Sequence, residues 1–234
     1  MGSYRFRISA LIIILLSLLS VITILSGQVA AVEDGFDAIV NDLRHGNKTE
    51  RIAALEKLAA MKDERSLEAI IEEFHELHED WHIRIMALDA LAVSGDPRVT
   101  NSLVDGLNDS CPAIKWHGAV GLGGYNNVHA INALIHALDD STMFVRETAI
   151  ESLGKIRAPE VVPYLDNELR HGNFAVRLKS TVALGRIGDE QALVLLKWVA
   201  HNEKDFFIRD KAVSILTNRQ NAVLSDNNKL GATK

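Results

Sequence analysis

Apolar and polar positions repeat along this chain with a period of about 31 residues. The marker is a β-branched apolar residue followed by a basic one: Ile83-Arg84, Ile114-Lys115, Val145-Arg146, Val176-Arg177 and Ile208-Arg209. The basic residues of these pairs are 31, 31, 31 and 32 positions apart, and Arg51 lies 33 positions before the first of them. A leucine stands seven positions after each basic residue. We therefore interpret residues 37–217 as one structural unit copied about six times.

Each copy predicts two helices joined by a short turn. The first helix carries apolar residues at helical spacing, as in Val145, Ala149 and Leu153. Eight positions after the basic residue a Gly or Ala recurs, and we expect it to let neighbouring helices approach closely. Twelve positions after it an Asp or Asn recurs, and its side-chain oxygen is expected to cap the second helix.

The second helix of each copy is expected to bury one stripe, as in Val161, Val162, Leu165 and Leu169. One helix pair cannot bury both of its faces, so the copies must stack on one another. The fold class predicted is all-α: a right-handed α-α superhelix of about six helical hairpins.

The pattern Val-Arg-x-x-Ala-x-x-x-Leu-Gly-x-Ile-x-x-x-x-x-Val, read from Val145 to Val162, resembles the HEAT-like repeats of the phycobilin lyase type. That family includes bilin lyases, deoxyhypusine hydroxylases and many scaffolds. For the hydroxylases, the resemblance implies iron held by His-Glu dyads directly after the Val-Arg pairs. The matching positions here are Met86, Trp116-His117, Glu147-Thr148, Leu178-Lys179 and Asp210-Lys211. None is a His-Glu dyad, so a two-iron site of that kind is not expected.

The first 31 residues are predicted to be a signal peptide or a retained membrane anchor. Arg5 and Arg7 precede an uncharged, apolar run of 18 residues, 8–25. That run is long enough to form a membrane helix, and Val29-Ala30-Ala31 offers a signal-peptidase site. Both alternatives place the repeat domain, 32–217, outside the cytoplasm: secreted, periplasmic or tethered to the membrane. Residues 218–234 are predicted to be a flexible tail.

The net charge, the cysteine count and the absence of certain motifs exclude several classes of function. The net charge of −6 argues against a nucleic-acid partner. Cys111 is the single cysteine, which excludes a disulfide framework and a cysteine-rich zinc site. The sequence contains no phosphate-binding loop and no nucleophile motif, so no cofactor is expected. Asn47 and Asn108 each begin a glycosylation acceptor pattern.

The basic residue of each repeat is expected to pair with acidic residues in the turns, because it recurs with the architecture. The second helices should line the concave side of the stack with a polar groove. Its residues are Glu68, Glu72, Asn101, Asp105, Asn132, His136, Asn167 and Trp198. Because extended repeat surfaces bind proteins, the leading interpretation is a non-enzymatic scaffold or adaptor with a protein partner in this groove.

Three alternatives to the scaffold remain open. These alternatives are a bilin-lyase-like enzyme, a deoxyhypusine-hydroxylase-like enzyme and a metal-binding protein. The metal alternative rests on His75, His78 and His82, which lie among three acidic residues within eight positions. Imidazoles together with a carboxylate suit zinc or another divalent transition metal.

Overall fold

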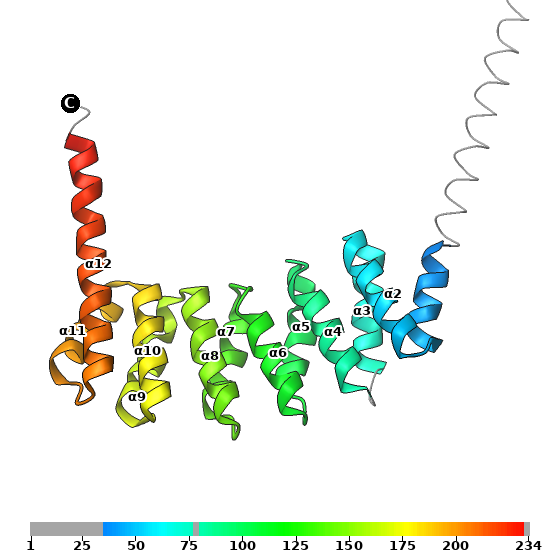
Figure 1. The fold of residues 1–234 in the computed structure, drawn as a ribbon, viewed down its shortest axis with the longest axis horizontal. Coiled ribbons are helices and arrows are strands. Elements are labelled where there is room, and N and C mark those ends of the chain that lie inside the picture. The colour runs from blue at the N-terminus through cyan, green and yellow to red at the C-terminus, as the bar shows by residue number, and fades with distance from the viewer. Residues whose placement is uncertain (1–34, 77–79, 232–234) are drawn as a thin grey trace, which may run out of the picture. The chain divides into compact units, whose positions relative to one another are not determined.

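The structure is a computed structural model that describes residues 35–76 and 80–231. All regular elements within these ranges are helices, in agreement with the all-α prediction (Figure 1). The described chain divides into two compact units, which meet between Ala60 and Met61. The predicted leader, 1–31, lies outside the described residues. Among the helices that are described, none is long and apolar enough to span a bilayer.

The first unit contains helical residues 35–45 and α2 (Lys48–Met61), whose last residue lies past the division. Asn47 caps α2 because its Oδ1 accepts the backbone N–H groups of Thr49 and Glu50. Arg51 Nε donates to the carbonyl oxygen of Leu43 at 3.1 Å. Arg51, the basic residue of the first repeat, therefore joins the two helices of this unit.

The second unit contains the remaining helices as alternating first and second helices of the repeat. They are α3 (Glu64–Glu76), α4 (Trp81–Ala92), η1 (Pro97–Val99), α5 (Thr100–Leu107), α6 (Pro112–Leu122), α7 (Val128–His136), η2 (Ala137–Asp139), α8 (Met143–Ile156), η3 (Pro159–Val161), α9 (Val162–His171), α10 (Phe174–Ile187), α11 (Glu190–Asn202) and α12 (Phe206–Gly231). The first helices of consecutive repeats, α4, α6, α8, α10 and α12, pack side by side. Four complete hairpins, from α4 to α11, thus stand between α3 and α12 in this unit.

The caps predicted for the second helices are confirmed. The side chains of Asp63, Asp96, Asn127 and Asp189 each accept a backbone N–H from the first turn that follows. The corresponding residue of the fourth copy is Ala158, which has no such oxygen. Pro97 and Pro159 begin the 3₁₀ turns that precede α5 and α9. Proline is tolerated at the first helical position because the N–H that it lacks would have no partner within the helix.

Close approach at the small-residue column is also confirmed. A Cβ added to Gly154 in α8 would lie 2.8 Å from the Cα of Ala183 in α10. At Gly123 and Gly185 the added atom would meet Ser152 and Ile215 of the next first helix, again at 2.8 Å. The predicted apolar stripes, such as Val145 with Leu153 and Val161 with Leu165, are buried.

The basic column joins consecutive turns of the stack, as predicted. Lys115 Nζ lies 2.6 Å from Asp140 Oδ2, and Arg177 Nε lies 3.1 Å from Glu203 Oε2. In both pairs the acid precedes the first helix of the next repeat. Arg146 has no acid at that place, and its guanidinium donates instead to the carbonyl oxygen of Asp140.

The residues predicted as a flexible tail begin within a helix, and their flexibility stays a prediction. Helix α12 continues from Phe206 to Gly231. The stretch after residue 217 contains no proline, and a helix that is already nucleated extends at little cost through polar residues. Residues 232–234 lie outside the described ranges.

Candidate functional site

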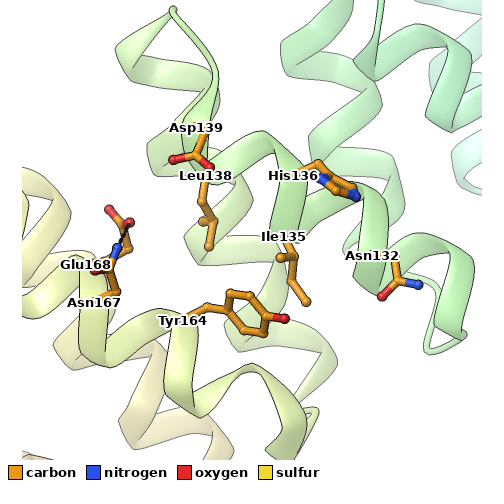
Figure 2. A pocket seen from close by; sticks show the side chains of 8 residues that line it. All are labelled: Asn132, Ile135, His136, Leu138, Asp139, Tyr164, Asn167 and Glu168. Atoms are coloured by element: carbon orange, nitrogen blue, oxygen red, sulfur yellow. Dashed lines mark hydrogen bonds between the residues drawn. The ribbon is translucent and has the colours of Figure 1, made fainter.

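A pocket with a volume of about 280 Å³ opens between the second helices of two consecutive repeats, α7 with η2 and α9 (Figure 2). Its lining residues are Asn132, Ile135, His136, Leu138, Asp139, Tyr164, Asn167 and Glu168. Ile135 and Leu138 provide apolar side chains, and the other lining residues are polar or aromatic. This combination of apolar side chains and a few convergent polar groups is typical of ligand sites.

Two carboxyl groups, Glu168 and Asp139, face this pocket. Burial raises the pKa of Glu168, and the negative charge of Asp139 adds to that effect. The amide of Asn167, whose Nδ2 donates to Glu168 Oε1 at 3.4 Å, opposes the increase. A half-buried carboxyl with a raised pKa beside a second carboxylate is suited to proton transfer.

The pocket also presents an aromatic ring and two carboxamides. Tyr164 is half-exposed and points toward Ile135 (Figure 2). Asn132 and Asn167 provide acceptor and donor groups on the two sides. No lysine or arginine is among the lining residues. The lining therefore offers carboxyl and amide oxygens to a ligand that donates hydrogen bonds.

The residues predicted for the groove are exposed on second helices of the second unit, as the buried stripe requires. Three of them line the pocket: Asn132, His136 and Asn167. The others are spread along α3, α5 and α11. They are Glu68, Glu72, Asn101, Asp105 and Trp198.

Several of these outlying residues have partners of their own, as Glu68 and Trp198 illustrate. Glu68 Oε1 lies 3.6 Å from Arg98 Nη1. The Trp198 ring lies under the guanidinium of Arg170, 4.9 Å from the ring centroid. Neither partner lines the pocket.

Sequence reasoning missed Glu168, Asp139 and Tyr164. The repeat register carries no clear signal for Glu168. It stands 22 positions after Arg146, where three other repeats hold Gly106, Ala137 and Val199 and the first repeat holds Glu73, all of them buried. Because a glutamate occurs at this position in two repeats, the register alone does not mark Glu168 for function.

The predicted metal ligands are not gathered in the part of the chain that the structure describes. His75 Nδ1 lies 3.9 Å from Asp105 Oδ2, whereas His82 stacks on Trp81. His78 lies outside the described residues. Across those ranges, no group of three His, Cys, Asp or Glu side chains is placed to hold a metal ion.

Comparisons with known proteins place these helices among repeat proteins. The family model described as HEAT repeats matches residues 36–114 and 100–172. A deoxyhypusine hydroxylase of Cryptococcus neoformans var. neoformans serotype D (strain B-3501A) is 34% identical over 110 residues, which are 45% of this chain and 30% of that protein. The chain thus spans less than a third of the length of this relative.

Solved structures resemble the chain in fold. The complex of CpcE and CpcF of phycocyanin lyase from Nostoc sp. PCC7120 matches with a TM-score of 0.55 at 19% identity, covering 77% of this chain and 75% of that one. A designed armadillo repeat protein in complex with peptide (KR)4 matches with a TM-score of 0.50 at 14% identity, covering 77% and 97%. The predicted resemblance to HEAT-like repeats of the lyase type is confirmed.

The leading functional interpretation from the sequence requires correction. The relative at 34% identity is named for an enzyme activity, which overturns the non-enzymatic scaffold and favours the enzyme alternative. The interpretation failed because the repeat pattern reports stacking, which enzymes and scaffolds of this fold share.

Proposed function

The chain belongs to the HEAT-repeat family, and we propose that it is an enzyme whose reaction takes place in the pocket between α7 and α9. The observation that carries this proposal is the pair of carboxyl groups, Glu168 and Asp139, in one cavity. The sequence similarity to a deoxyhypusine hydroxylase supports an enzyme. The fold likeness to phycocyanin lyase is compatible with it.

The chemistry of the lining residues indicates the substrate group. Two carboxylates repel each other, and a bound cation relieves that repulsion. The amide oxygens of Asn132 and Asn167 accept hydrogen bonds, and the ring of Tyr164 offers a face to a positive charge. We therefore propose an amine-bearing side chain of a protein as the substrate, because the pocket has the volume for one side chain.

Glu168 is proposed as the general base. With its raised pKa it binds a proton more strongly than an ordinary glutamate does, so it takes a proton from the substrate ammonium more readily. Asp139 is proposed to hold the positive charge in place, and its own charge adds to the effect of burial on the pKa of Glu168. General base catalysis of this kind contributes about 10²- to 10⁴-fold to a rate.

The residues do not fit the two-iron site that the hydroxylase resemblance implies. At the dyad positions, His117 Nδ1 lies 2.6 Å from Asp89 Oδ1, and Lys179 Nζ lies 3.3 Å from Glu151 Oε2. Both pairs link neighbouring first helices, and a lysine ammonium repels a metal cation. The proposed reaction therefore has no step through iron.

The test compares protein modification in the native host. Strains carry the wild-type full-length chain, Glu168→Gln, or the matched control Glu160→Gln, which changes an exposed glutamate of η3 outside the pocket. Tandem mass spectrometry measures the mass of amine-bearing side chains across the proteome. We expect one modification that is present in wild type and control and at least about 10²-fold lower in Glu168→Gln.

An identical set of modified side chains in all three strains would contradict the proposal. Hydrogen exchange of the purified Glu168→Gln chain checks that the variant keeps its fold. A reduced modification accompanied by lost protection in α7 and α9 would count as unfolding and not as lost catalysis.

A further inference from the structure

The first helices of the second unit share an apolar first residue. The five residues are Trp81, Pro112, Met143, Phe174 and Phe206, which begin α4, α6, α8, α10 and α12. The second residues of α8 and α12 are Phe144 and Phe207. All five aromatic rings among these residues are strongly exposed, from 45% for Phe144 and Phe174 to 71% for Phe207.

These helix starts lie along one edge of the second unit, because consecutive first helices pack side by side (Figure 1). A direct contact joins two of them: Asn173 Nδ2, next to Phe174, donates to Met143 Sδ at 3.3 Å. We name the apolar edge by its exposed members, Trp81, Met143, Phe144, Phe174, Phe206 and Phe207.

Folding does not require this edge. The helices bury other residues, such as Ile83 in α4 and Val145 in α8, at 0% exposure. The helix dipole favours acidic residues in a first turn, yet α4, α6, α8, α10 and α12 have none there. A contiguous exposed apolar surface on a protein indicates an interaction site.

The charges beside the edge identify the kind of partner. The basic column follows these residues by two or three positions. Lys115 and Arg177 pair with the acids Asp140 and Glu203 of the adjacent turns, whereas Arg146 and Arg209 donate to backbone carbonyl oxygens. Beside Phe144 and Phe207 the edge is therefore bordered by cations, although the chain carries a net charge of −6. Such a surface meets a lipid headgroup layer without charge repulsion.

The chain also carries an uncharged apolar run, 8–25, that is long enough to enter a bilayer. A segment in the membrane would hold the rest of the chain at high effective concentration near lipid. Aromatic residues favour the interface between water and the hydrocarbon layer. We propose that the apolar edge lies on a lipid surface, with Trp81, Phe174 and Phe206 in the interface.

The test measures tryptophan fluorescence of the full chain in vesicles of phosphatidylcholine and phosphatidylglycerol whose acyl chains carry bromine, a short-range quencher. One variant keeps only Trp81, through Trp116→Phe and Trp198→Phe. The matched control keeps only Trp198, which has similar exposure but lies on a second helix away from the edge. We expect brominated lipid to reduce the emission of Trp81 and to leave that of Trp198 unchanged.

A second pair of variants tests the rest of the edge. Phe206→Ser with Phe207→Ser should weaken the quenching of Trp81, because both rings are exposed and their loss leaves the core intact. Val194→Ser removes an equally exposed apolar residue from α11 and should leave the quenching unchanged.

Equal emission of Trp81 in brominated and ordinary vesicles would overturn the proposal. So would a Trp81 emission that shifts with protein concentration in the absence of vesicles, because that result assigns the edge to a second copy of the chain.

Discussion

At the residue scale, two half-buried glutamates show how neighbours decide the state of a carboxyl group. Burial by itself acts to raise the pKa of both Glu151 and Glu168. At Glu151 the hydrogen bond and charge of Lys179, together with the charges of Lys155 and Arg186, outweigh burial, and the pKa is lowered. At Glu168 the nearby Asp139 strengthens the effect of burial, and the pKa is raised. Only Glu168 is therefore poised for proton exchange in a pocket.

A titration followed by ¹³C NMR of the glutamate carboxyl groups should place the pKa of Glu168 above, and that of Glu151 below, the ordinary value. Asp139→Asn removes the negative neighbour, so the pKa of Glu168 should fall while staying raised, since burial is its main cause. The pKa of Glu151, in another part of the stack, should not move in this variant. An unchanged pKa of Glu168 in Asp139→Asn would show that the two carboxyl groups do not interact.

The same two residues predict opposite pH dependences of stability. A raised pKa means that the folded chain keeps a proton on Glu168 at pH values where the unfolded chain has released it. The free energy of unfolding therefore falls as pH rises from the ordinary glutamate pKa through the raised pKa of Glu168. Glu151 stabilises the fold above the ordinary pKa, and that contribution is lost as pH falls through its lowered value. Urea unfolding at several pH values should therefore give a weaker loss of stability for Glu168→Gln as pH rises above the ordinary glutamate pKa, and a weaker loss for Glu151→Gln as pH falls below it.

At the element scale, the basic column joins first helices to neighbouring turns, and Arg177 joins α10 to the turns on both sides of it. Arg177 donates to Glu203 in the turn after its hairpin and, through Nη1, to the carbonyl oxygen of Gly172 in the turn before α10. The side chain of Glu203 is only 8% exposed. Removal of the guanidinium would leave a buried carboxylate without its cation.

Arg177→Met should consequently lower the free energy of unfolding by about 1–3 kcal/mol, measured by urea denaturation. The control is Lys155→Met, which breaks the exposed pair of Lys155 with Glu151, and it should cost at most about 1 kcal/mol. Equal losses in the two variants would mean that the basic column contributes no more than a surface ion pair.

Glycine sets the distance between α5 and α6. A Cβ at Gly118 would lie 2.4 Å from the backbone N of Leu107 and 2.8 Å from the carbonyl oxygen of Leu103. Backbone atoms cannot move aside as a side chain does, so Gly118→Ala should cost about 1–3 kcal/mol in urea unfolding. At Gly124 the nearest atom is 3.4 Å away, and Gly124→Ala should be close to neutral. Loss of stability in both variants would attribute the effect to the substitution type and not to helix contact.

At the scale of the whole molecule, each repeat of the second unit packs chiefly on its neighbours. Helix α8 contacts α6 on one side and α10 on the other. In such stacks stability is close to a sum of repeat terms and nearest-neighbour interfaces. A defect in one repeat should therefore weaken the adjacent repeats most.

Ile150→Ala tests this expectation, because Ile150 in α8 is fully buried. The cavity should cost about 2–5 kcal/mol. Amide hydrogen exchange should show the largest loss of protection in α6, α8 and α10 and a smaller loss in α3. A uniform loss over all helices would indicate a single cooperative unit instead of nearest-neighbour coupling.

The repeat could be read from the chain because its cause is local and recurs. The spacing of Val145, Ala149 and Leu153 reports one helix face, and Asp96 or Asn127 caps whichever helix follows it. Five or more copies in one register leave little freedom for another fold. The groove residues, the small-residue column and the basic column followed from the same register.

The pocket depends on what the repeats do not share. Asp139 and Glu168 belong to different hairpins, 29 positions apart, and they become neighbours only when α7 and α9 stack. The pKa of Glu168 depends on burial and on Asp139, neither of which is encoded within one helix. Repeat periodicity is a property of single helices, whereas the chemistry of a site depends on side chains that distant segments bring within a few ångströms. The chain therefore specified its helices and their order, and the stacking of those helices decided where two carboxyl groups meet.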